Sequence, residues 1–219
     1  MLSPKEARQF YDNFGKKQDH QFYERVPLKL LIDQSDFATA RFVFEFGCGT
    51  GRLAELLLQS YLSEASSYQA IDISDVMVSL SRQRLARFAK QIQIDCSDGN
   101  FELQLHNSSV DRFVSTYVLE LLNITDIQLL LKEAHRILAD RGLLCLAVLS
   151  HGNTFISRRV SKIWTAIHKY RPMLVGGCRP INLASQLPKD MWRFKHNQTM
   201  VSWGVPSQVI VAEKMSQQQ

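Results

Sequence analysis

Residues 43–52 read Val-Phe-Glu-Phe-Gly-Cys-Gly-Thr-Gly-Arg, an apolar run with one acid followed by three glycines at alternating positions. Such a run is typical of a buried parallel strand, and good helix formers follow at 53–58. Glycine adopts positive φ readily and lets a ligand approach the backbone, while free amides at a helix N-terminus attract polar groups. The segment therefore predicts a strand, a tight ligand-binding turn and a helix start.

The glycine spacing argues against a dinucleotide-binding turn. That fingerprint has the spacing G-x-G-x-x-G, which would place its third glycine at position 52. The residue there is Arg52. A nicotinamide-dependent oxidoreductase is therefore a disfavoured alternative.

Strand and helix patterns alternate along the rest of the chain. We expect further strands at 68–73, 91–94, 110–115 and 143–149. The expected helices cover 76–88, capped by Ser74-Asp75, and 125–138, capped by Thr125-Asp126 and followed by Gly142. In the 76–88 helix, Arg82, Arg84 and Arg87 should face solvent. This alternation predicts an α/β fold with a doubly wound, mostly parallel sheet.

An acid stands at the end of the second expected strand. Asp72 follows Gly51 by 21 residues, a spacing typical of the carboxylate that binds ribose hydroxyls in nucleotide-binding α/β folds. Ligands of doubly wound sheets bind beyond the carboxyl ends of the strands, here between the first and fourth. We expect Asp72 to lie in that crevice with the glycine turn.

The pattern apolar-Glu-apolar-Gly-x-Gly-x-Gly at 43–51 resembles the first motif of class I S-adenosylmethionine-dependent methyltransferases, of the small-molecule, type 11-like group. The resemblance implies a seven-stranded Rossmann-like sheet that ends in an antiparallel hairpin, for which 192–203 and 208–212 are suited. It also implies S-adenosyl-L-methionine as cofactor and S-adenosyl-L-homocysteine as product. The implied cofactor-binding residues are Glu45, Gly47, Cys48, Gly49, Gly51, Asp72, Ile73, Met77, Asp98, Gly99, Ser115, Thr116 and Tyr11.

Within this set, the resemblance gives each group a role. The glycine turn would hold the methionine part of the cofactor, Asp72 its ribose and Met77 its adenine ring, although helical spacing makes Met77 equally suited to the core. Asp98, with Asp95 as a competitor, would accept a hydrogen bond from the adenine amino group. Tyr117 would face the substrate. The Asn-Pro-Pro-Tyr signature of enzymes that methylate nucleobase amines is missing, so DNA is not the expected substrate.

The N-terminal residues 1–39 are rich in aromatic side chains. In resembling small-molecule methyltransferases such a segment is a lid over the cofactor, which would make Tyr11 and Tyr23 contacts; simple helix packing explains them equally well. The chain would then be one domain over 1–219. It would comprise this lid, a cofactor-binding core at 40–150 and a substrate side at 151–219.

The cysteine spacing and the N-terminal sequence indicate the cellular compartment in which we expect the protein. Four cysteines are scattered without metal-ligand spacing, so we expect reduced thiols and no metal. The N-terminus has no signal-peptide pattern, and no apolar run is long enough to span a bilayer. We therefore expect a cytoplasmic protein.

Positive charge is concentrated at the C-terminal end. Residues 151–219 hold 10 Lys and Arg against 2 Asp and Glu, whereas residues 1–150 hold 16 against 19. A helix at 155–170 spaces Ile156, Val160, Ile163 and Ile167 along one stripe, which we expect to cover the sheet beside the substrate pocket; docking on an anionic membrane is the less favoured alternative.

Three residues are candidates for substrate contact. Arg179 would grip an anionic substrate, His151 lies just after the fifth strand, and Tyr117 follows the fourth. None is identified as a catalytic base, because the reaction needs one only if the nucleophile arrives protonated.

The sequence thus predicts an enzyme that transfers a methyl group from S-adenosylmethionine to oxygen or nitrogen of a small molecule, with an anionic substrate as one hypothesis. An RNA methyltransferase, a non-catalytic S-adenosylmethionine-binding regulator and the oxidoreductase are the alternatives. The oligomeric state stays open.

Overall fold

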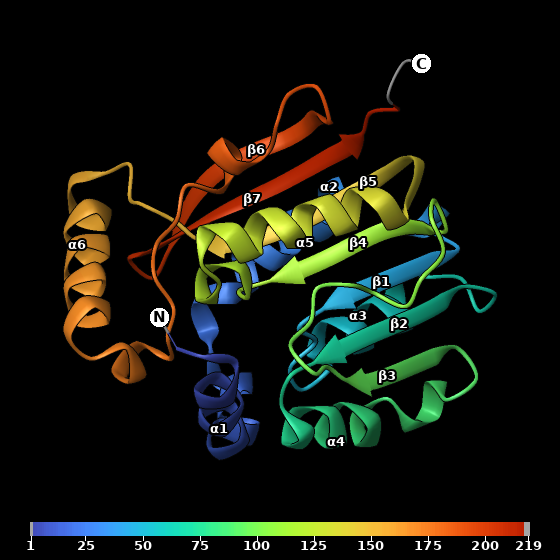
Figure 1. Ribbon diagram of the computed structural model, residues 1–219, viewed down its shortest axis with the longest axis horizontal. Coiled ribbons are helices and arrows are strands. Elements are labelled where there is room, and N and C mark those ends of the chain that lie inside the picture. The colour runs from blue at the N-terminus through green and yellow to red at the C-terminus, as the bar shows by residue number, and fades with distance from the viewer. Residues whose placement is uncertain (1, 217–219) are drawn as a thin grey trace.

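The computed structural model describes residues 2–216 and contains one seven-stranded sheet of order β3-β2-β1-β4-β5-β7-β6 (Figure 1). The strands are β1 (Phe42–Phe46), β2 (Ser67–Asp72), β3 (Ile92–Cys96), β4 (Val110–Thr116), β5 (Leu138–Leu149), β6 (Trp192–Ser202) and β7 (Val205–Lys214). The α-helices are α1 (Pro4–Phe14), α2 (Arg25–Gln34), α3 (Arg52–Ser60), α4 (Asp75–Arg84), α5 (Ile124–Ile137) and α6 (Phe155–Tyr170).

The strand order confirms the predicted doubly wound sheet. β1 pairs in parallel with both β2 and β4, so the order reverses there and creates the switch point at which ligands bind. β7 runs antiparallel between β5 and β6, with Leu143 opposite Glu213 and Leu149 opposite Ser207. The expected terminal hairpin is therefore present, inserted beside the fifth strand.

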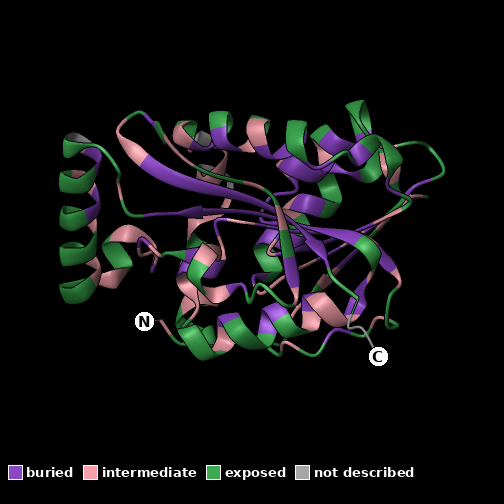
Figure 2. Cartoon of the chain, turned by 90° about the horizontal axis from the view of Figure 1, so that it is seen from above, coloured by how far each residue is buried: buried purple, intermediate pink, exposed green. Residues whose placement is uncertain are grey.

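Helices cover both faces of this sheet. On one face, α2, α3 and α4 pack on alternate side chains of the strands, such as Val43 and Cys145. On the other face, α5 packs on the intervening ones, such as Phe44 and Leu144. Figure 2 shows the central strands as a buried layer between helices whose outer sides are exposed. Because both faces are covered, the central strands read as continuous apolar runs.

Local signals set most helix starts. Ser74 caps α4 as predicted, its side chain accepting a hydrogen bond from the Met77 amide. The predicted cap of α5 at Thr125-Asp126 is wrong: Asn123 caps it and accepts from the Asp126 amide at 2.9 Å. The helix ends at Ile137, one residue before the expected end, and the strand expected from 143 starts earlier. β5 begins at Leu138, four residues before Gly142.

Helix α6 stands at one end of the molecule, beyond the faces of the sheet (Figures 1 and 2). The predicted apolar stripe does not cover the sheet: Ile163 is 61% exposed and Ile167 is 36% exposed, while the Ile156 side chain lies outside the described part. The inward face carries Ser157 and Ser161 instead. Within residues 2–216, no helix combines the length and apolar character needed to cross a bilayer.

Candidate functional site

The glycine turn lies at the carboxyl end of β1, where the strand order reverses. Gly47, Gly49 and Gly51 all have positive φ, between 52° and 80°. The amides of Gly47 and Cys48 both donate to the carbonyl oxygen of Ile71, which fixes the turn against the end of β2. A side chain at Gly51 would be 2.4 Å from the Ser81 hydroxyl, so the turn also packs closely on α4.

Asp72 ends β2 directly beside this turn. Its two carboxylate oxygens accept hydrogen bonds from the amides of Gly49, at 2.8 Å, and Ser74, at 2.9 Å. Burial raises the pKa of Asp72, and the backbone hydrogen bonds oppose that rise. The carboxylate therefore joins the glycine turn to the start of α4. Its predicted contact with ribose hydroxyls stays a prediction, for which each oxygen keeps a free lone pair.

The residues expected around adenine meet at the ends of β2 and β3. A Cβ on Gly99 would be 3.8 Å from the Ile73 side chain. Asp98 is exposed and accepts two hydrogen bonds from Asn100. Its competitor Asp95 pairs with Arg82 at 3.6 Å, which engages that carboxylate elsewhere.

Met77 lies in the first turn of α4 and is fully buried. Its side chain belongs to the protein interior, and contact with an adenine ring would require the surroundings to open. The predicted role is untested.

The end of β4 contributes residues with distinct positions. Ser115 is buried and donates to the Phe46 carbonyl at 2.8 Å, which ties β4 to β1. Thr116 lines a cavity at the glycine turn. Tyr117 has a φ of 58°, and its hydroxyl donates to Ser207 at 3.0 Å.

Residues 4–24, here called the lid segment, cover these strand ends. The segment consists of α1 and the short 3₁₀ helices η1 (Gly15–His20) and η2 (Phe22–Glu24). Arg8 donates to the carbonyl of Ile73 at 2.8 Å and to that of Ser97 at 3.0 Å. Ser74 donates to Asp12 at 2.6 Å. The lid segment therefore contacts the loops after β2 and β3.

Asp19 attaches the lid segment to the first turns of α3 and to the end of α4. Its carboxylate pairs with Arg84 and accepts from Thr50, while Arg52 donates to its backbone carbonyl at 2.8 Å. Burial raises the pKa of Asp19, but its hydrogen bonds and the two arginine charges outweigh this effect and leave the pKa lowered. The prediction that Arg84 faces solvent is wrong. Its partner is 65 residues away, so no helical pattern reveals it.

A cavity of about 40 Å³ lies between the glycine turn and the lid segment. Its lining includes Gln18, Glu24, Glu45 and Thr116. Glu45 is buried and accepts from the Tyr68 hydroxyl at 2.8 Å. Burial raises the pKa of both Glu24 and Glu45 to about 8. This space is far below the roughly 300–1,000 Å³ typical of ligand pockets.

Sequence reasoning missed Arg8, Gln18, Asp19 and Glu24. Gln18 packs against Gly49, where an added Cβ would be 2.8 Å from its Oε1 atom, and that oxygen is buried without a partner among the described residues. An orphaned acceptor at a glycine turn fits a ligand that carries hydrogen-bond donors. The clustering of polar residues just after α1 is the one sequence signal for this group.

The predicted substrate residues have separate environments. Arg179 donates to the carbonyls of Glu120, at 3.4 Å, and Leu122, at 2.7 Å, so its guanidinium holds the loop after β4. Tyr11 donates to the Gly176 carbonyl at 3.4 Å, and His151 is exposed beyond β5. Their predicted substrate and cofactor contacts are untested. Among residues 2–216, no group of three acids, histidines or cysteines is arranged to hold a metal.

The sheet is doubly wound and seven-stranded, with β7 antiparallel between β5 and β6 and a glycine turn at the switch point. This is the architecture of class I S-adenosylmethionine-dependent methyltransferases. A family model described as a methyltransferase domain matches residues 43–142. These residues thus form an S-adenosylmethionine-dependent methyltransferase domain.

Known proteins agree with this assignment. A curated relative, malonyl-[acyl-carrier protein] O-methyltransferase of Bacillus cytotoxicus, is 28% identical over 134 residues, which are 61% of this chain. The match spans 44% of that relative's length.

Solved structures show the same fold. YcgJ from Bacillus subtilis superposes with a TM-score of 0.68 at 12% identity and covers 88% of this chain and 99% of its own. The N-methyltransferase NodS from Bradyrhizobium japonicum, in complex with S-adenosyl-L-homocysteine, has a TM-score of 0.68 at 16% identity, covering 89% of this chain and 88% of its own.

Proposed function

We propose that the protein transfers a methyl group from S-adenosylmethionine to oxygen or nitrogen of a small molecule, with residues 4–24 as a lid. The observation that carries this proposal is the glycine turn at the switch point, bonded through the Gly49 amide to Asp72 and covered by the lid segment.

The donor and acceptor groups of the site suit this cofactor. S-adenosylmethionine carries an ammonium, ribose hydroxyls and a positive sulfonium, all of which are stabilised by oxygen acceptors. The site offers the orphaned oxygen of Gln18 and the carboxylates of Glu24 and Asp72. When bound, the cofactor supplies an electrophilic methyl group and a good leaving group.

The protein's part is then to bind, orient and enclose. Gly47, Gly49 and Asp72 would hold the methionine and ribose parts, as the family resemblance implies. The 40 Å³ cavity is too small for this ligand, so the lid segment must move for the ligand to enter. Positioning of two reactants can supply effective molarities of about 10⁵–10⁸ M, and closure over the site would maintain that alignment.

The location of Arg179 lends no support to an anionic acceptor. Two of its nitrogens already donate to backbone carbonyls of the loop after β4. The acceptor's class must therefore be inferred from other groups at that end of the sheet.

The test is transfer of label from methyl-labelled S-adenosylmethionine into fractions of a cell extract. Label in the low-molecular-mass fraction, missing with heat-denatured protein, is the expected result. Label confined to the RNA fraction would support an RNA methyltransferase. Cofactor binding without transfer to any fraction would leave the non-catalytic regulator as the better account.

A further inference from the structure

A second cluster of buried and half-buried polar side chains lies beside the glycine turn, at the carboxyl ends of β4 and β5. We call it the acceptor cluster, and it consists of Tyr23, Glu24, Tyr117, Glu120 and Cys178. Its members come from the lid segment, from the end of β4 with its following 3₁₀ turn η5 (Leu119–Leu121), and from the loop after the 3₁₀ turn η6 (Pro172–Val175).

Glu120 is the exceptional member of the acceptor cluster. Its side chain is fully buried, and Oε1 accepts from the Leu149 amide at 3.0 Å. Its second oxygen, Oε2, is buried and has no partner among the described residues. An unpaired buried carboxylate oxygen is costly, and native structures retain such a group only rarely. This oxygen is therefore available to a ligand.

The surroundings of Glu120 favour a ligand that donates hydrogen bonds. The rings of Tyr23 and Tyr117 pack edge to face at 5.8 Å, and both hydroxyls are engaged, by Gln21 and Ser207 respectively. Burial raises the pKa of both tyrosines, and the charges of Glu24 and Glu120 raise it further, as expected for close neighbours. The cluster's unused capacity therefore consists of carboxylate acceptors beside aromatic rings.

The nearby arginines do not pair closely with the carboxylates of Glu24 and Glu120. Arg52 is 3.9 Å from Glu24, at the limit of an ion pair, and Arg179 donates to carbonyl oxygens. Carboxylates with aromatic rings bind cationic amines through hydrogen bonds and cation–π contacts.

Given the proposed methyltransferase function, on which this inference rests, we propose that the methyl acceptor is an amine whose nitrogen donates to Glu120 Oε2 beside the rings of Tyr23 and Tyr117. An alkylammonium first gives one proton to the Glu120 carboxylate. The nitrogen lone pair then forms the new N–C bond as the C–S bond of the donor breaks, and the proton on Glu120 passes to solvent. Burial raises the pKa of Glu120 to about 8, so this group is largely protonated at neutral pH in the free protein. The positive charge of a bound ammonium favours the carboxylate form, which then accepts the proton.

The test uses protein saturated with S-adenosylhomocysteine and three compounds of similar skeleton: 2-phenylethylamine, 2-phenylethanol and 3-phenylpropionate. Calorimetry should show the amine binding at least about tenfold more tightly than the other two, a difference of about 1.4 kcal/mol. Glu120→Gln should abolish this preference while the affinity for S-adenosylhomocysteine stays within about twofold. Glu64→Gln, at an exposed site, is the matched control.

Tightest binding of the carboxylate, binding of none of the three, or an unchanged preference in Glu120→Gln would each overturn the amine proposal. Failure of the wild-type protein to bind S-adenosylhomocysteine would instead overturn the proposed function. If Glu120→Gln does not fold, Tyr117→Leu serves as the second variant and should weaken binding of the amine more than binding of 2-phenylethanol, because it removes a ring that the cation contacts.

Helix α6 carries an independent inference, because it turns apolar side chains outward. Phe155 is 72% exposed and Tyr170 is 79% exposed, while Ser157 and Ser161 face the protein. Trp164 anchors the inner side by donating to the Cys178 carbonyl at 3.0 Å. The helix is therefore held by its more polar face.

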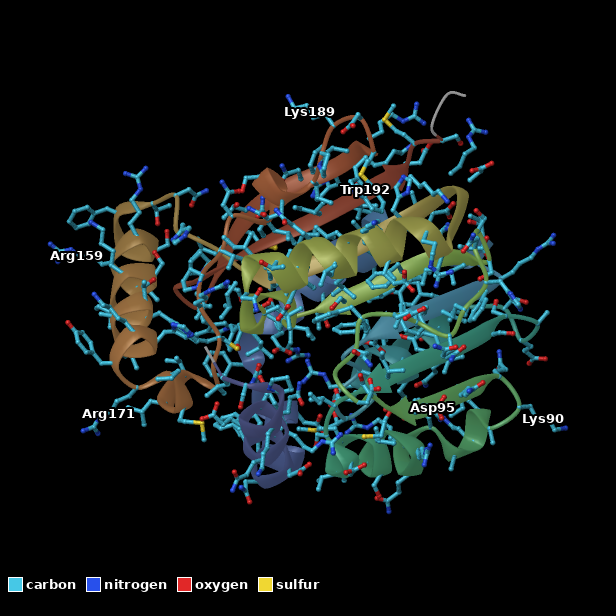
Figure 3. The ribbon with its side chains drawn as sticks, in the orientation of Figure 1. Lys90, Asp95, Arg159, Arg171, Lys189 and Trp192 are labelled. Carbon is cyan, nitrogen blue, oxygen red and sulfur yellow. The ribbon has the colours of Figure 1, made fainter. Side chains whose placement is uncertain are left out.

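Basic residues surround this apolar outer face. Residues 155–175 contain five Lys and Arg and no Asp or Glu. Arg159 lies over the Phe155 ring at 4.5 Å, and Figure 3 shows the Arg159 and Arg171 side chains pointing away from the body of the protein. Exposed Leu174 extends the apolar surface past the end of α6.

We infer that this face, α6 with residues 171–175, docks on an anionic lipid membrane. A basic helix with aromatic and aliphatic side chains on the same exposed side buries them at the headgroup boundary while its cations pair with lipid phosphates. RNA would use the charges but not the aliphatic side chains between them, so the lipid surface is the better partner.

Sedimentation with vesicles tests this inference. The protein should pellet with vesicles of phosphatidylcholine mixed equally with phosphatidylglycerol, and not with phosphatidylcholine alone. The double variant Phe155→Ser/Ile163→Ser should lose most binding. The double variant Lys90→Gln/Lys189→Gln should keep it, because those exposed lysines lie on distant parts of the fold (Figure 3). No binding to anionic vesicles, or salt-sensitive binding to RNA only, would overturn the inference.

Discussion

The buried carboxyl of Glu45 makes the stability of this fold depend on pH in a specific way. Burial raises its pKa from 4.5 to about 8, against the opposing effect of the Tyr68 hydrogen bond. Between these two values the unfolded chain is ionised at this position and the folded chain holds a proton. The contribution of Glu45 to the free energy of unfolding is therefore largest below pH 4.5, and it falls as the pH rises toward 8.

The magnitude follows from linkage. With these two pKa values, raising the pH from 5 to 7.5 removes about 3 kcal/mol from the free energy of unfolding at this one site, an upper estimate for a buried group. Glu45→Gln keeps an oxygen for the Tyr68 hydroxyl but does not titrate. Its stability relative to wild type should therefore rise by about 3 kcal/mol between pH 5 and pH 7.5.

Urea denaturation of both proteins at the two pH values measures this double difference, in which the contributions of Glu24 and Glu120 cancel. A thermal melt should show the same trend, at about 2–4 °C per kcal/mol for a chain of this size. An equal pH dependence for wild type and Glu45→Gln would refute the reasoning and show that Glu45 is ionised in the folded protein.

Two further substitutions test the turn and the lid segment. Gly51→Ala combines a φ of 77° with a contact of 2.4 Å to Ser81 and should cost about 2–4 kcal/mol. Gly204→Ala has a positive φ of 80° but open space and should cost only about 1 kcal/mol in the same denaturant titration. Asp19→Asn removes the ion pair that fastens the lid and should speed S-adenosylhomocysteine release in stopped-flow, whereas Asp33→Asn, in an exposed pair, should not. If wild type and Asp19→Asn released S-adenosylhomocysteine at the same rate, the ion pair of the lid segment would have no part in retaining the cofactor.

Local signals explain what the sequence predicted well. The positive-φ glycines, the Ser74 cap and the alternating strands depend on neighbours within a few residues, so the turn, the start of α4 and the alternation of strands and helices were predictable. The sequence also contained a signal for the start of α5. Asn123 and Asp126 have the spacing of a capping pair, but Thr125 offered a competing cap two residues later.

Partners distant in sequence explain what was missed. The ion pair between Asp19 and Arg84 joins positions 65 residues apart, and nothing in either helix indicates it. Similarly, the apolar spacing in α6 predicts a helix with an apolar face but does not say whether that face meets the protein or its surroundings. Glu120 gave no signal, because only the fold reveals that one of its oxygens lacks a partner.

The central claim is that the glycine turn and Asp72 form an S-adenosylmethionine site, and calorimetric titration with S-adenosylhomocysteine tests it most directly. We predict saturable one-to-one binding by the wild-type protein. Asp72→Asn should weaken it at least about tenfold, since a charged hydrogen bond contributes about 1.5–3 kcal/mol. A folded wild-type protein that binds no S-adenosylhomocysteine, or an unchanged affinity in Asp72→Asn, would contradict this account.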